Sequence, residues 1–215
     1  MTTQLHGLYG ITDSQLLPDT NTLISAVEAA LKGGMSVLQY RDKSQDKIKR
    51  LNQASQLKTL CQQYNACLII NDDIHLAAEV NADGVHLGQQ DQAIAQARKN
   101  LGENVIIGAT CHDSYPLAEA AYQQGADYIA LGRFFPSATK PNAPPASLSK
   151  IQQVSTNIPL PIVAIGGITL DNASMVINAG AHLVAVIHGL FASHNIQDTA
   201  QQFTQLFAKT NCTPK

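Results

Sequence analysis

Short apolar segments recur along the chain, and most of them are hydrophobic at nearly every position. Strands with one face in water alternate apolar and polar residues, whereas continuously apolar strands are typical of parallel sheets buried on both faces. The pattern therefore predicts eight buried parallel strands, at residues 8–12, 37–41, 67–72, 84–88, 105–110, 128–133, 161–167 and 183–189.

Amphipathic segments of helical period separate these strands. Leu23, Val27 and Leu31 share one helical face, and Gly33 is placed to end that helix. Ser114 is placed to start another. Further helices are expected at residues 44–64, 91–101, 147–156, 170–179 and 196–208.

The alternation of strands and helices predicts an α/β fold, a single (β/α)₈ barrel over residues 1–215 with a flexible tail at 209–215. An open, doubly wound sheet is the second possibility, but no GxGxxG motif follows the first strand. The segments "NADGVHLG", "GADYIALG" and "GAHLVAVI" resemble one another, which indicates a reused turn from helix to strand.

Composition narrows the class of protein. Only 14% of residues are charged and the formal net charge is −2, so no basic field is available to hold nucleic acid or an anionic membrane. The four cysteines form no CxxC pair, which predicts reduced and mostly buried thiols. Without a signal peptide or long apolar run, the expected protein is a cytoplasmic enzyme or binding domain. A homo-oligomer is compatible with the sequence but has no support in it.

Polar residues gather where a barrel has its active site, at the carboxyl ends of the strands. Strand alternation places Gln39, Arg41 and Lys43 on one side, as a grip for a diphosphate. The alternative is a solvated strand end whose charges face water.

Two acids follow adjacent strands, Asp72 after "LIIN" and Asp91 after "HLGQQ". Two carboxylates together with phosphate oxygens are usual for Mg²⁺. Each acid also precedes an apolar periodic stretch, so helix capping is the alternative for both. Zinc is not expected, because His75 and His86 lie far apart with no cysteine pattern around them.

The remaining candidates lie late in the chain. Segment 133–147 is long enough for an active-site loop and contains Ser137, Thr139 and Lys140, although a generic turn would have the same composition. Glycines in "AIGGI" and "VIHGL" would let backbone N–H groups approach a phosphate, or only allow tight packing. No Ser-His-Asp or Cys-His arrangement stands out, so the combination suits ionisation of a diphosphate leaving group.

In this order the motifs resemble the thiamine phosphate synthase family over nearly the whole chain. They are "LYGITD", "QYRDK", "IINDD", "GVHLGQQD", "IGATCH", "PSATK", "AIGGI" and "AVIHGLF". The resemblance implies a (β/α)₈-barrel transferase that joins 4-amino-5-hydroxymethyl-2-methylpyrimidine diphosphate to a thiazole phosphate. Pyrophosphate would leave first, and the thiazole nitrogen would capture the pyrimidine cation. A carboxylated thiazole would also lose CO₂.

The resemblance also implies roles for single residues. The pyrimidine diphosphate would be held by Gln39, Arg41, Lys43, Asn71, Thr110 and Lys140, of which Arg41, Lys43, Thr110 and Lys140 count as catalytic. The thiazole phosphate would be held by Ser137, Thr139, Gly167, Ile187 and His188. Asp72 and Asp91 would bind Mg²⁺, whereas Asp73 would cap the helix that begins at Ile74.

Several positions depart from the commonest family pattern. Asp42 stands where Glu is usual, Thr110 where Ser is common, and His188 where Ser is expected. Two other functions are alternatives to the synthase. A thiazole tautomerase on the same barrel needs no diphosphate or magnesium site, and a non-catalytic phosphate-binding regulator would leave both phosphate grips and the acid pair unexplained.

Overall fold

Eight parallel strands close into a barrel in the structure, a computed structural model that describes residues 5–89, 93–136 and 145–210. Each strand pairs with its neighbours in chain order, and the first pairs with the last. The expected (β/α)₈ barrel is therefore confirmed. The strands are β1 (Gly7–Ile11), β2 (Val37–Tyr40), β3 (Cys67–Asn71), β4 (Gly84–Leu87), β5 (Ile106–His112), β6 (Tyr128–Gly132), β7 (Ile162–Ile165) and β8 (Leu183–Val186).

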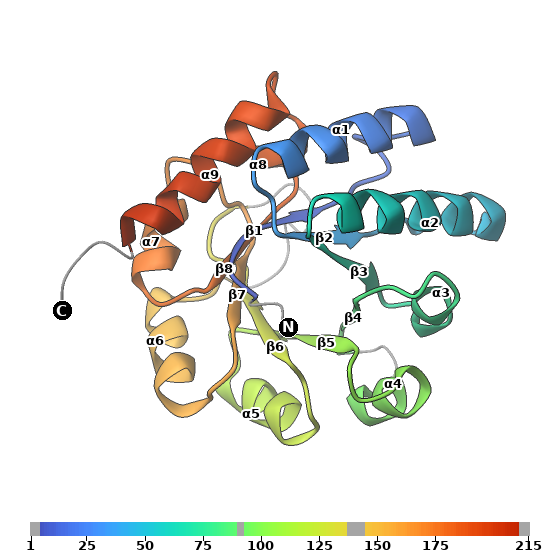
Figure 1. The fold of residues 1–215 in the computed structure, drawn as a ribbon. Coiled ribbons are helices and arrows are strands. Elements are labelled where there is room, and N and C mark those ends of the chain that lie inside the picture. Colours follow the sequence, from blue (N-terminus) through green and yellow to red (C-terminus); the bar gives the residue numbers. More distant parts are fainter. Residues whose placement is uncertain (1–4, 90–92, 137–144, 211–215) are drawn as a thin grey trace.

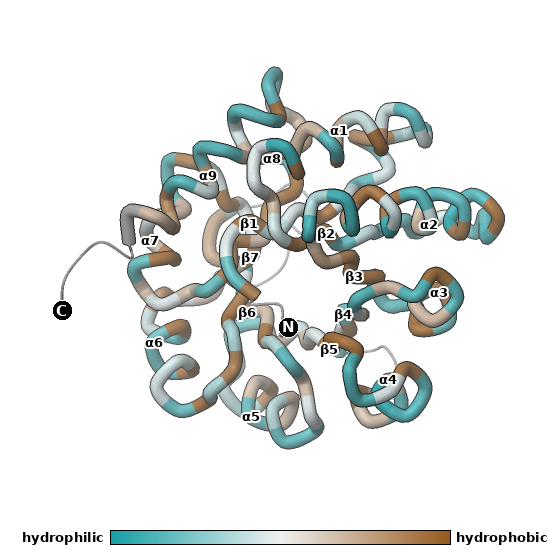
Figure 2. The backbone as a smooth tube through the Cα atoms, in the orientation of Figure 1, coloured by the Kyte–Doolittle hydropathy of each residue, from teal (hydrophilic) through white to brown (hydrophobic). Residues whose placement is uncertain are grey.

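Helices surround the barrel as a ring, with the strands inside it (Figure 1). Hydrophobic and hydrophilic residues are mixed within the turns of most helices, as expected when one face packs on the barrel and the other faces water (Figure 2). The helices are α1 (Thr20–Lys32), α2 (Lys47–Gln63), α3 (Ile74–Glu79), α4 (Ile94–Leu101), α5 (Tyr115–Gln123), α6 (Leu148–Asn157), α7 (Ala173–Asn178), α8 (His188–Phe191) and α9 (Ile196–Thr210).

Several helices begin at capping residues that the sequence provides. The side chain of Asp19 accepts a hydrogen bond from the N–H of Thr22 at the start of α1, and Ser114 accepts one from Leu117 at the start of α5. Gly33 follows α1, as expected, and an added Cβ there would lie 2.4 Å from a backbone oxygen of α9. The glycine therefore lets the last helix pack closely against the first.

Apolar side chains form two clusters, one inside the barrel and one between the barrel and its helices. The inner cluster takes alternate residues of the strands, such as Tyr9 and Ile11 on β1 and Val163 on β7. One inward position is a glycine, Gly108, where an added Cβ would lie 1.9 Å from the ring carbon Cζ of Tyr128. Gly108 thus leaves the space that this large ring occupies.

The described cysteines, Cys61, Cys67 and Cys111, are buried and form no disulfide. Burial raises the pKa of the Cys61 and Cys111 thiols to about 12. Both are therefore protonated and poorly nucleophilic near neutral pH. The expected burial is confirmed for these three, while Cys212 lies outside the described residues.

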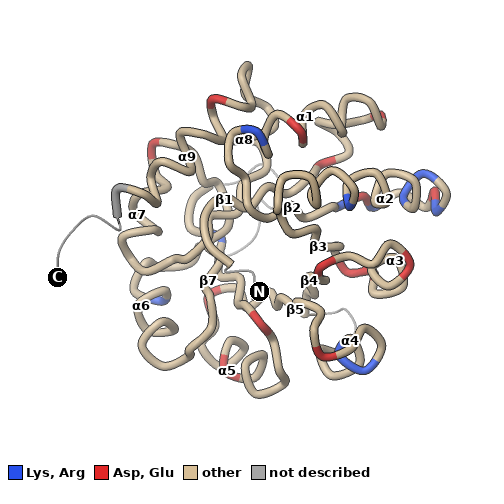
Figure 3. The backbone as a smooth tube through the Cα atoms, in the orientation of Figure 1, with Lys and Arg blue, Asp and Glu red and all other residues tan. Residues whose placement is uncertain are grey.

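Charges of both signs are interspersed around the ring of helices (Figure 3). Several form ion pairs between a helix and a neighbouring element. Lys58 of α2 lies 2.7 Å from Asp83, and Arg98 of α4 lies 2.7 Å from Asp127. Each pair fixes an aspartate that directly precedes a strand.

Those two aspartates join consecutive strands by a repeated contact, here called a strand clamp. Asp83, before β4, donates its N–H to the carbonyl of Leu68 on β3 at 2.9 Å and accepts the Leu68 N–H at its carboxylate at 2.8 Å. Asp127, before β6, does the same with Ile107 on β5, at 2.7 Å in both bonds. The resemblance between "NADG" and "GADY" therefore arises because the aspartate in each makes the same two hydrogen bonds.

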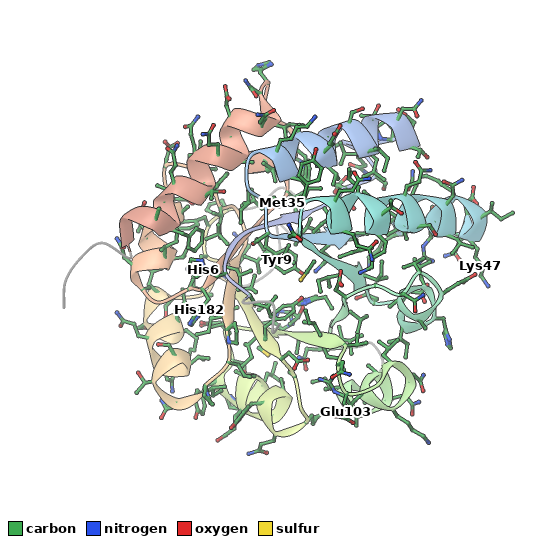
Figure 4. All side chains as sticks on the ribbon, in the orientation of Figure 1. His6, Tyr9, Met35, Lys47, Glu103 and His182 are labelled. Atoms are coloured by element: carbon green, nitrogen blue, oxygen red, sulfur yellow. The ribbon has the colours of Figure 1, made fainter. Side chains whose placement is uncertain are left out.

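His182 makes a third strand clamp before β8 (Figure 4). Its N–H donates to the carbonyl of Ile162 on β7 at 2.9 Å, and its ring atom Nδ1 accepts the Ile162 N–H at 3.2 Å. Only an unprotonated ring nitrogen can accept this bond. Partial burial and the neighbouring His6 lower the pKa of His182, which keeps the ring neutral near pH 7.

The end of β8 differs from the sequence prediction. A strand was expected over residues 183–189, but β8 ends at Val186 and the short helix α8 follows. Gly189 permits this turn, because an added Cβ would lie 2.6 Å from the carbonyl oxygen of Ile168. The loops after β7 and β8 are thereby brought into contact.

The last helix, α9, packs along α1 and runs to Thr210. Of the tail expected at residues 209–215, the part after Thr210 lies outside the described residues. No helix in the described ranges is long and apolar enough to cross a membrane.

Candidate active site

A cavity of about 630 Å³ opens at the carboxyl ends of the strands, and all eight strands contribute to its wall. This end of a (β/α)₈ barrel is where active sites are found. Every predicted site residue that the structure describes lines this cavity, namely Gln39, Arg41, Lys43, Asn71, Asp72, Thr110, Gly167, Ile187 and His188. The residues expected from strand ends are thus brought together.

Gln39, Arg41 and Lys43 reach the cavity from β2 and the residues after it. The hydroxyl of Thr12 accepts the Arg41 N–H at 2.8 Å and donates to the Arg41 carbonyl at 3.2 Å, which fixes the backbone at this strand end. Asp42, between the two cations, points away and forms an ion pair with α2. Alternation therefore leaves a guanidinium and an ammonium facing one space, suited to phosphate oxygens.

Asp72 faces the same space from the end of β3. Its φ of +62° is left-handed, a conformation that aspartate adopts more readily than most residues. Its Oδ2 atom accepts a hydrogen bond from Nδ2 of Asn71 at 2.6 Å and lies 3.5 Å from Nζ of Lys43. A carboxylate and the β2 cations thus meet across neighbouring strand ends.

The next residue, Asp73, caps α3. Its carboxylate accepts the N–H of Leu76 at 3.0 Å and a hydrogen bond from Nη2 of Arg50 at 2.7 Å. The expected cap at Asp73 is confirmed, and capping therefore does not explain Asp72.

Replacing Asp73 with alanine is expected to lower the free energy of unfolding at pH 7 by about 1–2 kcal/mol, through loss of the cap and the ion pair. Burial opposes the charged form, but hydrogen bonds from Leu76 and Arg50 outweigh it and hold the pKa of Asp73 below its usual value. Because this pKa is lower in the folded than in the unfolded state, the charged carboxylate stabilises the fold fully above about pH 4. This stabilisation is lost as the pH falls through the folded-state pKa.

Urea unfolding at pH 7 and pH 3 tests this expectation. The difference between wild type and Asp73→Ala should shrink at pH 3, while Asp73→Asn, which retains a cap, should be the milder change. A destabilisation that is the same at both pH values would contradict the role given to the carboxylate.

Among the cavity residues that had no predicted role at the site, Tyr9, Tyr128 and His86 are linked to one another. The two tyrosine hydroxyls lie 2.8 Å apart, and the ring of His86 stacks on that of Tyr128 with 5.6 Å between centroids. Figure 4 places Tyr9 within the ring of strands. Burial raises the pKa of both tyrosines. The sequence does contain a sign of the two tyrosines, because each stands at an inward position of a strand that is otherwise aliphatic.

Two glycines after β7 pack against the start of the long segment between β6 and α6. Gly166 and Gly167 have φ values of +104° and +65°. An added Cβ on Gly167 would lie 2.2 Å from the carbonyl oxygen of Pro136, and Phe135 donates its N–H to the Gly166 carbonyl at 3.0 Å. Nδ2 of Asn172 donates to the Gly167 carbonyl at 3.0 Å. The glycines are therefore closely packed and fix the base of the predicted loop, and Gly167 also lines the cavity.

The remaining predicted site residues fall outside the described ranges and stay predictions: Asp91, Ser137, Thr139 and Lys140. In the described part of the chain, no three His, Cys, Asp or Glu side chains gather as a metal cluster. Mg²⁺ usually takes only one or two carboxylates together with substrate phosphates and water. Asp72, a partly exposed carboxylate on the cavity wall, fits that requirement.

Fold and cavity together define the class: a (β/α)₈-barrel protein with its binding cavity at the carboxyl ends of the strands. A family model described as thiamine monophosphate synthase matches residues 8–190. The chain belongs to this family, which confirms the resemblance seen in its motifs.

Similar proteins agree with this placement. A thiamine-phosphate synthase of Alcanivorax borkumensis is 52% identical over 214 residues, covering 98% of each chain. One of Saccharophagus degradans is 54% identical over 196 residues, 91% of this chain and 90% of that protein. The solved structure of a thiamine phosphate pyrophosphorylase from Pyrococcus furiosus has a TM-score of 0.88 and 30% identity, covering 97% of this chain and 98% of that one.

Proposed function

We propose that this chain is a thiamine-phosphate synthase, a transferase that joins 4-amino-5-hydroxymethyl-2-methylpyrimidine diphosphate to a thiazole phosphate and releases pyrophosphate. The observation that carries the proposal is the meeting of Arg41 and Lys43 with Asp72 on one cavity wall. A magnesium diphosphate needs cations and a carboxylate together. Membership of the family supports the same activity.

The pyrimidine diphosphate would lie against β2, β3 and β5. Arg41 and Lys43 would hold its phosphates. Gln39 was expected beside them, but it is more buried than either cation and bonds to Tyr9 inside the barrel, so we place it with Asn71 and Thr110 against the pyrimidine. Mg²⁺ at Asp72 would supply further positive charge to the leaving group. The predicted ligand Asp91 and the predicted phosphate contact Lys140 complete this part of the proposal.

The thiazole phosphate would lie between the ends of β7 and β8. Gly167, Ile187 and His188 line the cavity there, and His188 begins α8. Barrels often hold phosphate with the loops after strands seven and eight and a short extra helix. Ser137 and Thr139, just beyond Pro136, are the predicted hydroxyl contacts.

Positioning and charge carry the proposed reaction. No cysteine or serine of the described residues lines the cavity, so these residues offer no covalent route of that kind. Arg41 and Lys43 would stabilise the charge that develops on the departing pyrophosphate. The bound thiazole would then present its nitrogen to the pyrimidine cation at short range.

Small molecules, and not nucleic acid, are the partners that we propose. Interspersed charges and a net charge of −2 support this choice (Figure 3). The described cysteines are buried and form no disulfide, which suits a reducing compartment, so we place the reaction in the cytoplasm.

Purified protein with Mg²⁺ and both phosphorylated substrates is expected to release one pyrophosphate for each thiamine phosphate formed. Chelation of Mg²⁺ should stop the reaction, and added Mg²⁺ should restore it. Folded protein that forms no product would contradict the proposal. Isomerisation of the thiazole without pyrophosphate release would instead identify a tautomerase.

A further inference from the structure

Side chains from five strands form a continuous line of hydrogen bonds across the inside of the barrel. Nε2 of Gln39 donates to the Tyr9 hydroxyl at 2.8 Å, and the hydroxyls of Tyr9 and Tyr128 lie 2.8 Å apart. The Tyr128 hydroxyl lies 2.9 Å from Nδ1 of His86, whose Nε2 lies 2.8 Å from Oγ1 of Thr110. We call this line the tyrosine–histidine chain.

The tyrosine–histidine chain is a buried structure whose two ends border the cavity. Tyr9 and Tyr128 are each 1% exposed, Gln39 is 3% exposed and His86 is 9% exposed. Buried polar groups lose free energy when they lack a partner, so each link is strongly favoured. The ends, Gln39 and Thr110, are the residues placed against the pyrimidine above.

Each link holds one proton, so the links must share a direction if every buried proton is to be bonded. When the Gln39 amide donates to Tyr9, the Tyr9 hydroxyl donates to Tyr128. The Tyr128 hydroxyl then donates to Nδ1 of His86, so the histidine proton is on Nε2 and points to Thr110. Thr110 in turn donates its own proton to the cavity, while Gln39 offers its carbonyl oxygen there.

The reverse direction is equally complete. If the Gln39 amide turns over, its oxygen accepts from Tyr9, which accepts from Tyr128. His86 then carries its proton on Nδ1, and its Nε2 accepts from Thr110. In this state Gln39 offers an N–H group to the cavity, and Thr110 offers a lone pair.

The single proton of the Thr110 hydroxyl is therefore available to the cavity only in the first direction, in which the Gln39 oxygen faces the cavity. This holds while the tyrosines keep their protons, as their raised pKa values ensure. It also holds while His86 has one N–H and one acceptor nitrogen. In the reverse direction the Gln39 nitrogen faces the cavity and Thr110 can only accept there, so the hydrogen bonds that the two ends offer are linked.

We propose that Tyr9, Tyr128 and His86 are positioning residues that force Gln39 and Thr110 to present one donor and one acceptor to the substrate ring. This inference rests on the proposed function, in which both ends contact the pyrimidine. A 4-aminopyrimidine matches such a pair, because its amino group donates and its ring nitrogens accept. A 4-methoxypyrimidine has acceptors only, so it leaves one end unpaired, and we expect a loss of affinity of about tenfold from that mismatch.

The direction of the chain can be read without any substrate. In Gln39→Glu the carboxylate can only accept, so the chain should take the reverse direction and the His86 proton should move from Nε2 to Nδ1. Nitrogen-15 NMR of the imidazole rings between pH 7 and 9 reports the tautomer, with the His86 signals assigned by their loss in His86→Asn. The wild type, in which the Gln39 amide donates to Tyr9, should show the Nε2–H form, and Gln39→Glu should show the Nδ1–H form.

Two further variants separate coupling from local disturbance. Tyr128→Phe keeps the ring but breaks the line, so Gln39→Glu should no longer set the His86 tautomer when both changes are combined. Tyr40→Phe is the matched control, because Tyr40 on β2 is also buried and its hydroxyl lies 2.8 Å from a glutamine oxygen, that of Gln53, outside the barrel. It should leave the His86 tautomer as in the wild type.

A binding measurement keeps the inference testable if Gln39→Glu does not fold. Calorimetry without Mg²⁺ or thiazole gives the Kd of the 4-amino and 4-methoxy pyrimidine diphosphates for wild type, Tyr128→Phe and Tyr40→Phe. The preference for the 4-amino compound should fall about tenfold in Tyr128→Phe and stay unchanged in Tyr40→Phe. Steric effects of the methoxy group cancel in this comparison.

Failure of this inference is distinct from failure of the proposed function. The coupling is overturned, even if thiamine phosphate is formed, by either of two results. One is that the His86 tautomer is unchanged in folded Gln39→Glu, and the other is that it changes equally when Tyr128→Phe is also present. An unchanged 4-amino preference in Tyr128→Phe overturns it as well. Absence of product with a coupled tautomer would overturn only the synthase assignment.

Discussion

Replacing Asp72 with asparagine is expected to lower turnover at least about 100-fold without unfolding the barrel. The amide has the same shape and tolerates the left-handed backbone at this position, where φ is +62°. It removes the negative charge that lies 3.5 Å from Nζ of Lys43 and that would hold Mg²⁺. Steady-state rates over a range of Mg²⁺ concentrations measure the loss, and thermal unfolding checks the fold.

The neighbouring acid gives the matched control. Asp73→Asn removes the same charge one residue further along, where the carboxylate caps α3. Its turnover should stay within about twofold of wild type, because the change is away from the cavity. Equal losses in both variants, or Mg²⁺-dependent turnover that survives in Asp72→Asn, would show that Asp72 has no special role.

Replacing Gly167 with alanine is expected to lower kcat/KM for the thiazole phosphate at least about tenfold and stability by about 2 kcal/mol. The new Cβ would lie 2.2 Å from the carbonyl oxygen of Pro136 in a backbone with φ of +65°. That carbonyl directly precedes the predicted contacts Ser137 and Thr139. Varying each substrate in turn, together with urea unfolding, measures both effects.

Gly125→Ala isolates the contribution of backbone strain. Gly125 also has a positive φ, +87°, but an added Cβ there would meet nothing within 4 Å. It should cost about 1–2 kcal/mol of stability and leave both KM values unchanged. A Gly167→Ala enzyme with normal kinetics and only this strain penalty would refute the role given to the contact with Pro136.

The barrel and most of its cavity could be predicted from sequence for physical reasons. Strands buried on both faces must be apolar at nearly every position, so they stand out even when they are four or five residues long. Once the strands are known, parallel alignment brings all their carboxyl ends to one face. Arg41 and Asp72 could therefore be placed together although 30 residues separate them.

The tyrosine–histidine chain could not be predicted in this way. Its links join Tyr9 to Tyr128 and Tyr128 to His86, which are 119 and 42 residues apart. Periodicity shows that a side chain points inward, but not which side chain it meets across the barrel. Helix α8 could not be predicted for another reason. It has only four residues, and so short a segment shows no periodicity that would distinguish a helix from the end of a strand.

The strand clamps divide the chain into units that could be exchanged between related proteins. Asp83, Asp127 and His182 each tie a strand to the one before it, and Ser36 ties β2 to Leu8 of β1 through its own N–H and hydroxyl, at 3.1 and 3.2 Å. A crossover placed between such pairs of strands moves every clamp together with its partner, whereas one placed inside a pair separates the clamping side chain from the backbone group that it binds. Because the clamps lie at the opposite end of the barrel from the cavity, chimaeras assembled from whole pairs offer a way to vary substrate contacts and stability separately.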